Sequence, residues 1–421
     1  MSPQNGGSTS HGLCGPSPCA LRGIGNDGFA RTPAASLPRT LPLALNRVRI
    51  LQVYRTGFPD SQGGSEEVIR TLSRGLVARG AEVTVVFPSP AVRFAGEHMD
   101  QGVRVCRIPQ SFEVASCNVS LRGLTTFRRL AASADVLHYH FPWPWGDVMD
   151  VLAAAGSAPR VVTYHSDIVR QRLLAIPYAP LMHRFLGRAD AIVATSPQYP
   201  LHSEVLKRHA GRVRVIPIGI DDARVPRPEP PRVQAWRERF GENFFLFVGV
   251  LRYYKSLDVL VRAAVGAPWQ VVIAGEGPEG ARLRGLARDL GASNVHFTGY
   301  VSDADKWALL ALARAFVLPS ALPAEAYGVS LLEAMCCGLP LVTARIGTGV
   351  DFVNREDETG LKVAPGAPGD LRQALDRLRA EDSLCARFGD ASRRRVLSSL
   401  RADTMVDGYL GLYRELLDDI R

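Results

Sequence analysis

Long apolar stretches are missing from this 421-residue chain, in which runs such as ALLALA at 308–313 are among the longest. A membrane-spanning helix needs about 18 or more apolar residues, so no transmembrane segment is expected. Residues 1–36 are rich in Gly, Ser, Pro and polar residues and contain no apolar stretch of the kind that a signal peptide requires. We therefore predict a cytoplasmic protein.

Cysteine is also sparse, and its spacing matches no zinc or redox motif. The seven cysteines are odd in number, and Cys336 and Cys337 are adjacent. This usage favours free thiols in a reducing cytosol over a disulfide framework.

Lysine is scarce as well, with four in the chain, but arginine raises the net charge to +9. Residues 46–220 contain 21 basic and 13 acidic side chains, whereas residues 221–421 contain 26 and 27. An excess in the first half suggests an anionic partner there, such as a membrane surface or a phosphorylated acceptor. No basic run interleaved with aromatic residues occurs, so nucleic acid is not expected as a partner.

Hydrophobic periodicity divides the chain into segments, and its length suggests two domains. Residues 1–45 show no periodicity and are predicted to be a disordered extension. Apolar strands alternate with helical patterns over 46–220, and the alternation restarts over 243–400 after a proline-rich linker at 221–242. Predicted strands cover 48–54, 82–87, 103–108, 135–140, 160–165, 190–195, 213–218, 244–250, 269–275, 294–299, 315–320, 339–344 and 359–364.

This alternation predicts an α/β protein whose parallel sheets are covered on both faces. Two Rossmann-like domains are expected to face each other across a cleft. Ligands of such sheets bind beyond the carboxyl ends of the strands, so the cleft is the expected active site.

The segment EAYGVSLLEAMCCGLPLV (325–342) contains the most informative pattern. Glu325 precedes a predicted helix and Glu333 lies on it, so their backbones are expected to be about 10–12 Å apart. Paired glycosidase carboxylates stand at roughly 5–5.5 Å or 6.5–9.5 Å, which argues against a hydrolytic pair and favours contacts to the two ends of one long ligand. The helix N-terminus offers free N–H groups to a diphosphate.

Glu325 and Glu333 resemble the E-x7-E signature of retaining glycosyltransferases of family 4, which have the GT-B fold; the likeness covers about 47–420. In that family the first Glu contacts the transferred sugar and the second the nucleotide ribose. The resemblance assigns the phosphates to the helix start at Tyr327, Gly328 and Val329. It also implies that 46–220 binds the acceptor, that 243–400 binds the donor, and that a helix at 401–421 returns to the first domain.

Basic and glycine-bearing loops extend the predicted donor site. Lys255 follows a strand in GVLRYYKS, where a pyrophosphate needs compensating charge, and matches the family pattern. Arg252 is displaced by two positions from the family's arginine. Gly63 and Gly64 resemble the family's glycine loop, and Gly275 in AGEGP is predicted to shape the nucleotide pocket, although turn chemistry alone would explain it.

Histidines and aspartates raise the question of a metal. His165 matches the family's histidine beside the transferred sugar. His138 and His140 share one strand face, but no third ligand is visible, and we assign His140 to the acceptor. Asp303 and Asp305 form a D-x-D motif that is better explained as a helix cap than as a metal site. No metal and no cofactor is expected.

Together these patterns predict a retaining, metal-independent hexosyltransferase. Similarity of FFLFVGVLRYYKS, VVTYHSDIVRQ and HYHFPWPW to bacterial enzymes favours transfer of mannose or D-rhamnose from a GDP-sugar to a lipid-linked saccharide at the inner face of the cell membrane. The alternatives are a nucleotide-sugar epimerase of the same architecture and a catalytically inactive binding subunit. A dinucleotide oxidoreductase would need G-x-G-x-x-G after the first strand, which FPDSQGGSEE lacks.

Overall fold

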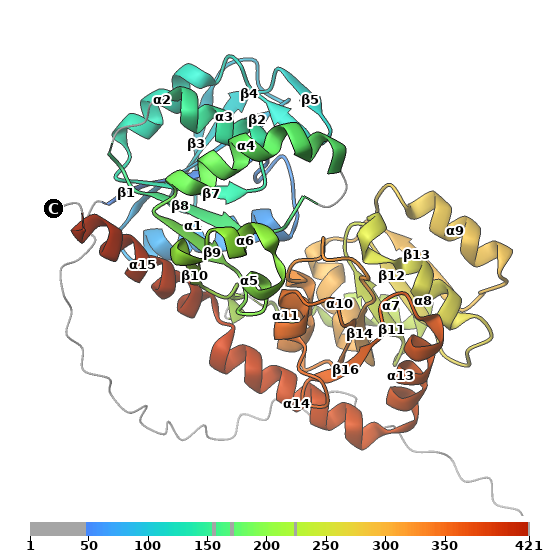
Figure 1. The fold of residues 1–421 in the computed structure, drawn as a ribbon. Helices are drawn as coiled ribbons and strands as arrows, with labels where there is room; N and C mark the ends of the chain where they lie inside the picture. The colour runs from blue at the N-terminus through green and yellow to red at the C-terminus, as the bar shows by residue number, and fades with distance from the viewer. Residues whose placement is uncertain (1–47, 154–156, 169–171, 223–224, 420–421) are drawn as a thin grey trace, which may run out of the picture. The chain divides into compact units, whose positions relative to one another are not determined.

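A computed structural model describes residues 48–153, 157–168, 172–222 and 225–419 (Figure 1). The disordered extension predicted at 1–45 lies outside the described residues, as do Cys14 and Cys19. No disulfide joins the described cysteines, in agreement with the prediction; they are Cys106, Cys117, Cys336, Cys337 and Cys385.

The N-terminal half contains a sheet with the strand order β10-β9-β8-β7-β1-β2-β4-β3, in which only β3 is antiparallel to its neighbour. Successive β1 residues Ile50 and Leu51 belong to separate apolar clusters, so both faces of the sheet are covered. The strands are β1 Arg49–Val53, β2 Glu82–Ser89, β3 Gly96–Asp100, β4 Val103–Pro109, β7 Val136–Phe141, β8 Arg160–Tyr164, β9 Ala191–Ala194 and β10 Val213–Val215.

Helices pack on both faces of this sheet (Figure 1). Leu72 of α1 joins the cluster that contains Ile50, whereas Phe127 of α2 and Phe185 of α4 join the cluster on the other face. The helices are α1 Gly64–Ala78, α2 Leu124–Ser133, α3 Pro144–Ala153, α4 Arg172–Arg188, α5 Tyr199–His202 and α6 Glu204–Arg208.

The C-terminal half contains a second, entirely parallel sheet with the order β13-β12-β11-β14-β15-β16. Its strands are β11 Phe245–Val248, β12 Val271–Ala274, β13 Val295–Gly299, β14 Ala315–Leu318, β15 Leu341–Ala344 and β16 Gly360–Val363. Its helices are α7 Pro230–Phe240, α8 Leu257–Ala264, α9 Gly280–Asp289, α10 Asp303–Leu312, α11 Val329–Cys336, α12 Gly349–Val353, α13 Pro368–Ala380 and α14 Asp382–Ser399.

The α/β class and the largely parallel sheets agree with the sequence prediction, but three strands of the described residues were not predicted. β3 has the sequence GEHMD, and its polar and charged side chains lack the apolar pattern by which strands were predicted, as is common for edge strands. β5 Phe112–Val114 and β6 Cys117–Val119 form a short separate hairpin. The segment 221–242 was predicted as a linker, yet its second half is helix α7, which packs against α10. Proline at the first position of α7 supports a helix start there.

The last helix, α15 Ala402–Asp418, packs against α1 of the N-terminal half (Figure 1). Tyr413 is hydrogen-bonded to His138 Nδ1 at 2.7 Å, and Tyr409 to the Thr163 hydroxyl at 2.6 Å. All four side chains are buried, so these bonds satisfy polar groups that would otherwise be costly in the interior.

Candidate active site

The loop between β14 and α11 is held by hydrogen bonds on several sides. Thr348 donates its hydroxyl to the Glu325 carbonyl at 2.8 Å, and the Gly349 N–H donates to the Ala326 carbonyl at 2.7 Å. Tyr327 donates its hydroxyl to the Ile218 carbonyl at 2.8 Å. The backbone ahead of α11 is therefore fixed.

Glu325 and Lys255 form a buried ion pair within this loop region. Lys255 Nζ donates to Glu325 Oε2 at 2.8 Å, and the Ser320 hydroxyl donates to the same oxygen at 3.2 Å. Burial by itself would lower the pKa of Lys255, but the Glu325 carboxylate and Tyr254 together outweigh it and the pKa is raised. Lys255 therefore stays charged next to Glu325.

Glu333 forms a second, separate ion pair. Its Oε1 accepts from Lys306 Nζ at 2.6 Å, and Lys306 also donates to Asp303 at 3.0 Å. Burial opposes the charge of Lys306, yet Glu333 and Asp303 raise its pKa to about 12. The two glutamates of the signature thus each face a lysine, and α11 begins between them.

The first residues of α1 and α11 lie next to each other. A Cβ on Gly64, which begins α1, would stand 3.3 Å from Val329, which begins α11. Gly328 has φ of +76°, and a Cβ there would stand 2.8 Å from the Leu318 side chain, so glycine is required. Gly63 precedes α1 in extended backbone. The predicted glycine loop and the predicted phosphate-binding helix start therefore meet.

Histidines from neighbouring strands form a buried group. His140 Nδ1 is 3.0 Å from His165 Nε2, and His140 Nε2 is 2.6 Å from Gln52 Oε1. Both nitrogens of His140 are occupied and its side chain is 2% exposed. This arrangement does not support the prediction that His140 contacts the acceptor, because no ring nitrogen is free to reach it.

Burial keeps these rings neutral. It lowers the pKa of His165 to about 4, with a further contribution from Arg55, and lowers that of His138 to about 3. The pKa of His140 lies well below its ordinary value for the same reason, with His138 and His165 adding to the effect.

Arg252 and Gly275, both predicted to bind the donor, make none of the contacts just described. Arg252 is exposed and precedes the single 3-10 turn Tyr253–Lys255; it forms no ion pair with the described residues. Gly275 has φ of +131°, and a Cβ there would stand 2.1 Å from the Gly249 carbonyl oxygen. Close approach of two backbone segments thus explains Gly275 without a ligand.

Ser302, directly before the D-x-D motif, caps α10, in agreement with the helix-cap prediction. The Ser302 hydroxyl accepts from the Asp305 N–H at 3.2 Å, and the Asp305 carboxylate accepts from Trp236 and Arg232, both at 3.0 Å. No group of three or more His, Cys, Asp or Glu side chains suited to a metal occurs among the described residues.

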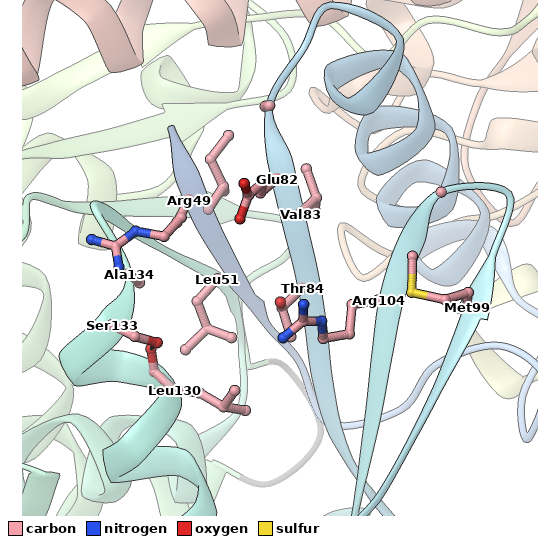
Figure 2. A pocket seen from close by; sticks show the side chains of 13 residues that line it. Arg49, Leu51, Glu82, Val83, Thr84, Met99, Arg104, Leu130, Ser133 and Ala134 are labelled. Atoms are coloured by element: carbon pink, nitrogen blue, oxygen red, sulfur yellow. Dashed lines mark hydrogen bonds between the residues drawn. The ribbon is translucent and has the colours of Figure 1, made fainter. Parts of the chain in front are cut away.

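One cavity lies away from these residues, at the amino ends of β1 and β2 (Figure 2). It measures about 200 Å³, and Arg49, Glu82, Thr84 and Arg104 are among its lining residues. Ligands of parallel sheets bind at the opposite, carboxyl ends of the strands, so this cavity is not the predicted site. Within the described residues, no helix combines the length and apolar character needed to cross a bilayer.

Comparison with known proteins decides the family. Residues 62–224 match the model of Glycosyltransferase Family 4, and residues 232–395 match that of Glycosyl transferases group 1. The chain is 42% identical over 371 residues to O-antigen chain mannosyltransferase C of Escherichia coli, covering 88% of this chain and 99% of that protein. The chain belongs to the family 4 glycosyltransferases.

A second relative of this glycosyltransferase is a D-rhamnosyltransferase of Pseudomonas aeruginosa, which is 45% identical over 332 residues, 78% of this chain and 86% of that protein. The fold resembles sucrose-phosphate synthase from Thermosynechococcus elongatus, with a TM-score of 0.75, 23% identity and coverage of 88% and 99% of the two chains. It also resembles a glycosyltransferase involved in lipopolysaccharide biosynthesis, with a TM-score of 0.62, 17% identity and coverage of 86% and 99%. The GT-B prediction is confirmed.

Three residues that contact predicted site residues of the glycosyltransferase were not predicted from the sequence. Lys306 could have been suspected because the chain has only four lysines. Gln52 is a polar residue inside the apolar strand RILQV and is fully buried, which signals a required hydrogen bond. Arg55 gave no sequence signal; it follows β1, donates to the Ser116 carbonyl at 3.3 Å and lowers the pKa of His165.

Proposed function

We propose that this glycosyltransferase moves a hexose, mannose or D-rhamnose, from a GDP-sugar to a lipid-linked saccharide during synthesis of a bacterial surface polysaccharide. Two relatives above 40% identity support the choice of sugar, one an O-antigen chain mannosyltransferase and the other a D-rhamnosyltransferase. The site residues assigned from sequence support the remaining parts of the proposal, which are the nucleotide-sugar donor and the transfer reaction.

The observation that carries this proposal is the meeting of the α1 and α11 N-termini at Gly64 and Val329, beside the Lys255–Glu325 pair. Two helix N-termini place positive dipole ends close together, and a donor diphosphate would relieve their mutual repulsion. In this arrangement Glu325 contacts the sugar on one side of the diphosphate, and Glu333 contacts the ribose on the other.

The proposed reaction retains the configuration of the sugar. The acceptor hydroxyl attacks C1 on the face from which the diphosphate leaves, so the new C1–O bond forms as the C1–O–phosphate bond breaks. The hydroxyl proton passes to the departing phosphate oxygen. Lys255, the exposed Arg252 and the backbone N–H groups at Tyr327 to Val329 stabilise the charge that develops on the leaving group.

A thermal-shift screen tests the donor. A ligand that binds only the native state raises the melting temperature, so a GDP-sugar should stabilise the protein more than UDP-, ADP- or dTDP-sugars at equal concentration. The Lys255→Ala variant is the matched control and should show a much smaller shift. A larger shift with another nucleotide-sugar would reassign the base.

Two product measurements test the remaining chemistry. NMR of the product should show the same anomeric configuration as the donor, and inversion would rule out the retaining mechanism. Transfer should persist in EDTA, because the Asp305 carboxylate accepts hydrogen bonds from Arg232 and Trp236 and the Asp303 carboxylate accepts one from Lys306. Loss of transfer that Mn²⁺ restores would contradict metal independence.

We also propose that the protein works at the cytoplasmic face of the membrane, held reversibly by charge. Exposed arginines of the N-terminal half support this proposal, among them Arg122, Arg128 and Arg129 at α2 and Arg184 and Arg188 on α4. Arg170, another arginine of the basic N-terminal half, lies outside the described residues. A lipid-linked acceptor has to be met at that surface.

A further inference from the structure

Three side chains on adjacent strands form a hydrogen-bonded row in the N-terminal sheet. Gln52 lies on β1, His140 on β7, and His165 directly after β8; these strands are neighbours in the sheet. Gln52 contacts His140 at 2.6 Å, and His140 contacts His165 at 3.0 Å. All three are buried, with His165 the most exposed at 8%.

Charge is strongly disfavoured in this row. Burial lowers the pKa of both His140 and His165, and Arg55 adds to the effect at His165. The ring centroid of Tyr54 lies 5.9 Å from that of His140 and 6.0 Å from that of His165, and the His138 ring lies 4.4 Å from His140. At neutral pH each imidazole is uncharged and therefore carries one N–H and one bare nitrogen.

Two distances then determine where the protons lie. Turning the Gln52 amide leaves one of its two polar atoms unpaired in either orientation, but 2.6 Å lies at the short end for N–H···O and is shorter still than N–H···N requires. His140 Nε2 therefore donates to the amide oxygen, and His140 Nδ1 is bare. Nδ1 must accept the Nε2–H of His165, which leaves His165 Nδ1 as a bare acceptor.

We propose that His140 is a positioning residue: with Gln52 behind it, it holds His165 in the Nε2–H form and makes His165 Nδ1 accept a hydrogen bond from a hydroxyl of the sugar substrate. The sugar as ligand rests on the proposed function. The tautomer of His165 follows from the row alone.

Nitrogen NMR of the full-length protein, labelled with ¹⁵N-histidine, tests the tautomer without any substrate. The chain has nine histidines, and His165→Asn identifies the signals of His165 by their disappearance. We expect Nδ1 of His165 to have the shift of an unprotonated nitrogen and Nε2 that of a protonated one. The reverse pattern would overturn the proposal.

Gln52→Met removes the acceptor behind His140 while keeping the side-chain length. The His165 signals should then move toward the Nδ1–H form or toward a mixture of the two. Ser73→Ala is the matched control, because Ser73 is also fully buried in the N-terminal half and its hydroxyl has no hydrogen-bond partner among the described residues. Unchanged His165 signals in Gln52→Met would also overturn the proposal.

Kinetics test the role in transfer. We expect Gln52→Met to lower kcat/KM by about tenfold, with a melting temperature close to that of Ser73→Ala. His140→Asn can place an amide oxygen near the former Nδ1 and should retain more activity than His140→Phe, which offers no acceptor. Equal activity of the two His140 variants would contradict the proposal that His140 positions His165. Because the NMR needs no donor, the tautomer can be correct even if the GDP-sugar assignment fails.

Discussion

Lys255 Nζ lies 2.8 Å from Glu325 Oε2, and the two side chains are only 11% and 10% exposed. The lysine follows β11 and the glutamate follows β14, which are hydrogen-bonded neighbours in the second sheet. A buried pair of this kind depends on both partners, since removal of one leaves an uncompensated charge in the interior. The pair therefore combines a structural role with the proposed chemistry.

Glu325→Gln should still fold and bind the donor, with an unfolding free energy lower by about 3 kcal/mol because Lys255 is left buried without its partner. Transfer should slow by about 100-fold or more, because an electrostatic contact at the reacting sugar is lost. Steady-state kinetics together with donor titration by calorimetry measure transfer and donor binding separately. Glu356→Gln, which alters an exposed pair with Arg345, is the control and should turn over normally. Near-normal turnover of Glu325→Gln would remove Glu325 from the sugar site.

Lys255→Ala should weaken donor binding by tenfold or more and also slow transfer, because the diphosphate is charged in the ground state and in the transition state. The free energy of unfolding should fall by about 3 kcal/mol, since Glu325 is left buried without its partner. Lys207→Ala removes an exposed pair with Glu204 and should change unfolding by less than about 1 kcal/mol. Unchanged donor affinity in Lys255→Ala would place the diphosphate elsewhere.

Asp305→Asn should reveal a pH-dependent contribution of the α10 cap. Burial would raise the pKa of Asp305, but bonds from Ser302, Trp236 and Arg232 outweigh it and lower the pKa to about 2. Because this value lies below the ordinary 3.8, the stabilisation is fully present above about pH 4 and disappears as the pH falls through about 2.

Urea unfolding at several pH values measures this effect. The difference in unfolding free energy between wild type and Asp305→Asn should be largest near neutral pH and should shrink between about pH 4 and 2. Asp289→Asn, at an exposed position, should show no such change. A difference that stays constant with pH would mean that the charge of Asp305 does not stabilise the cap.

Arg128→Glu combined with Arg129→Glu should weaken binding to vesicles that contain anionic lipid. Both side chains are exposed on α2, and basic residues near an anionic leaflet contribute on the order of 1 kcal/mol each. Sedimentation should show wild-type binding at low salt and release near half-molar salt, because screening shortens the range of the attraction.

Arg284→Glu combined with Arg288→Glu, at two exposed positions of α9 in the C-terminal half, changes the net charge by the same amount and should bind vesicles like the wild type. Vesicle binding that ignores salt would indicate apolar insertion or a protein partner in place of electrostatic attraction. Failure to bind at low salt would reject membrane attachment by charge.

Local patterns predicted most of the fold because strands buried on both faces must be apolar throughout. FLFV at β11 and VVIA at β12 are such strands, and both form where expected. β3 was not predicted because its GEHMD sequence is polar, as befits a strand at the sheet edge. α7 was not predicted because its segment begins with a proline-rich stretch that resembles a linker. Edge strands and helix starts depend on neighbours that a local pattern does not show.

The sequence alone determined the α/β alternation, the Glu325 and Glu333 spacing, and the helix start between them, because these features lie within one short segment. The tertiary structure decided which side chains meet. It paired Lys306 with Glu333, brought Gly64 against Val329, and buried His140 between Gln52 and His165. Such contacts join distant segments through the order of strands in a sheet and the packing of helices on it, and neither is visible in local spacing.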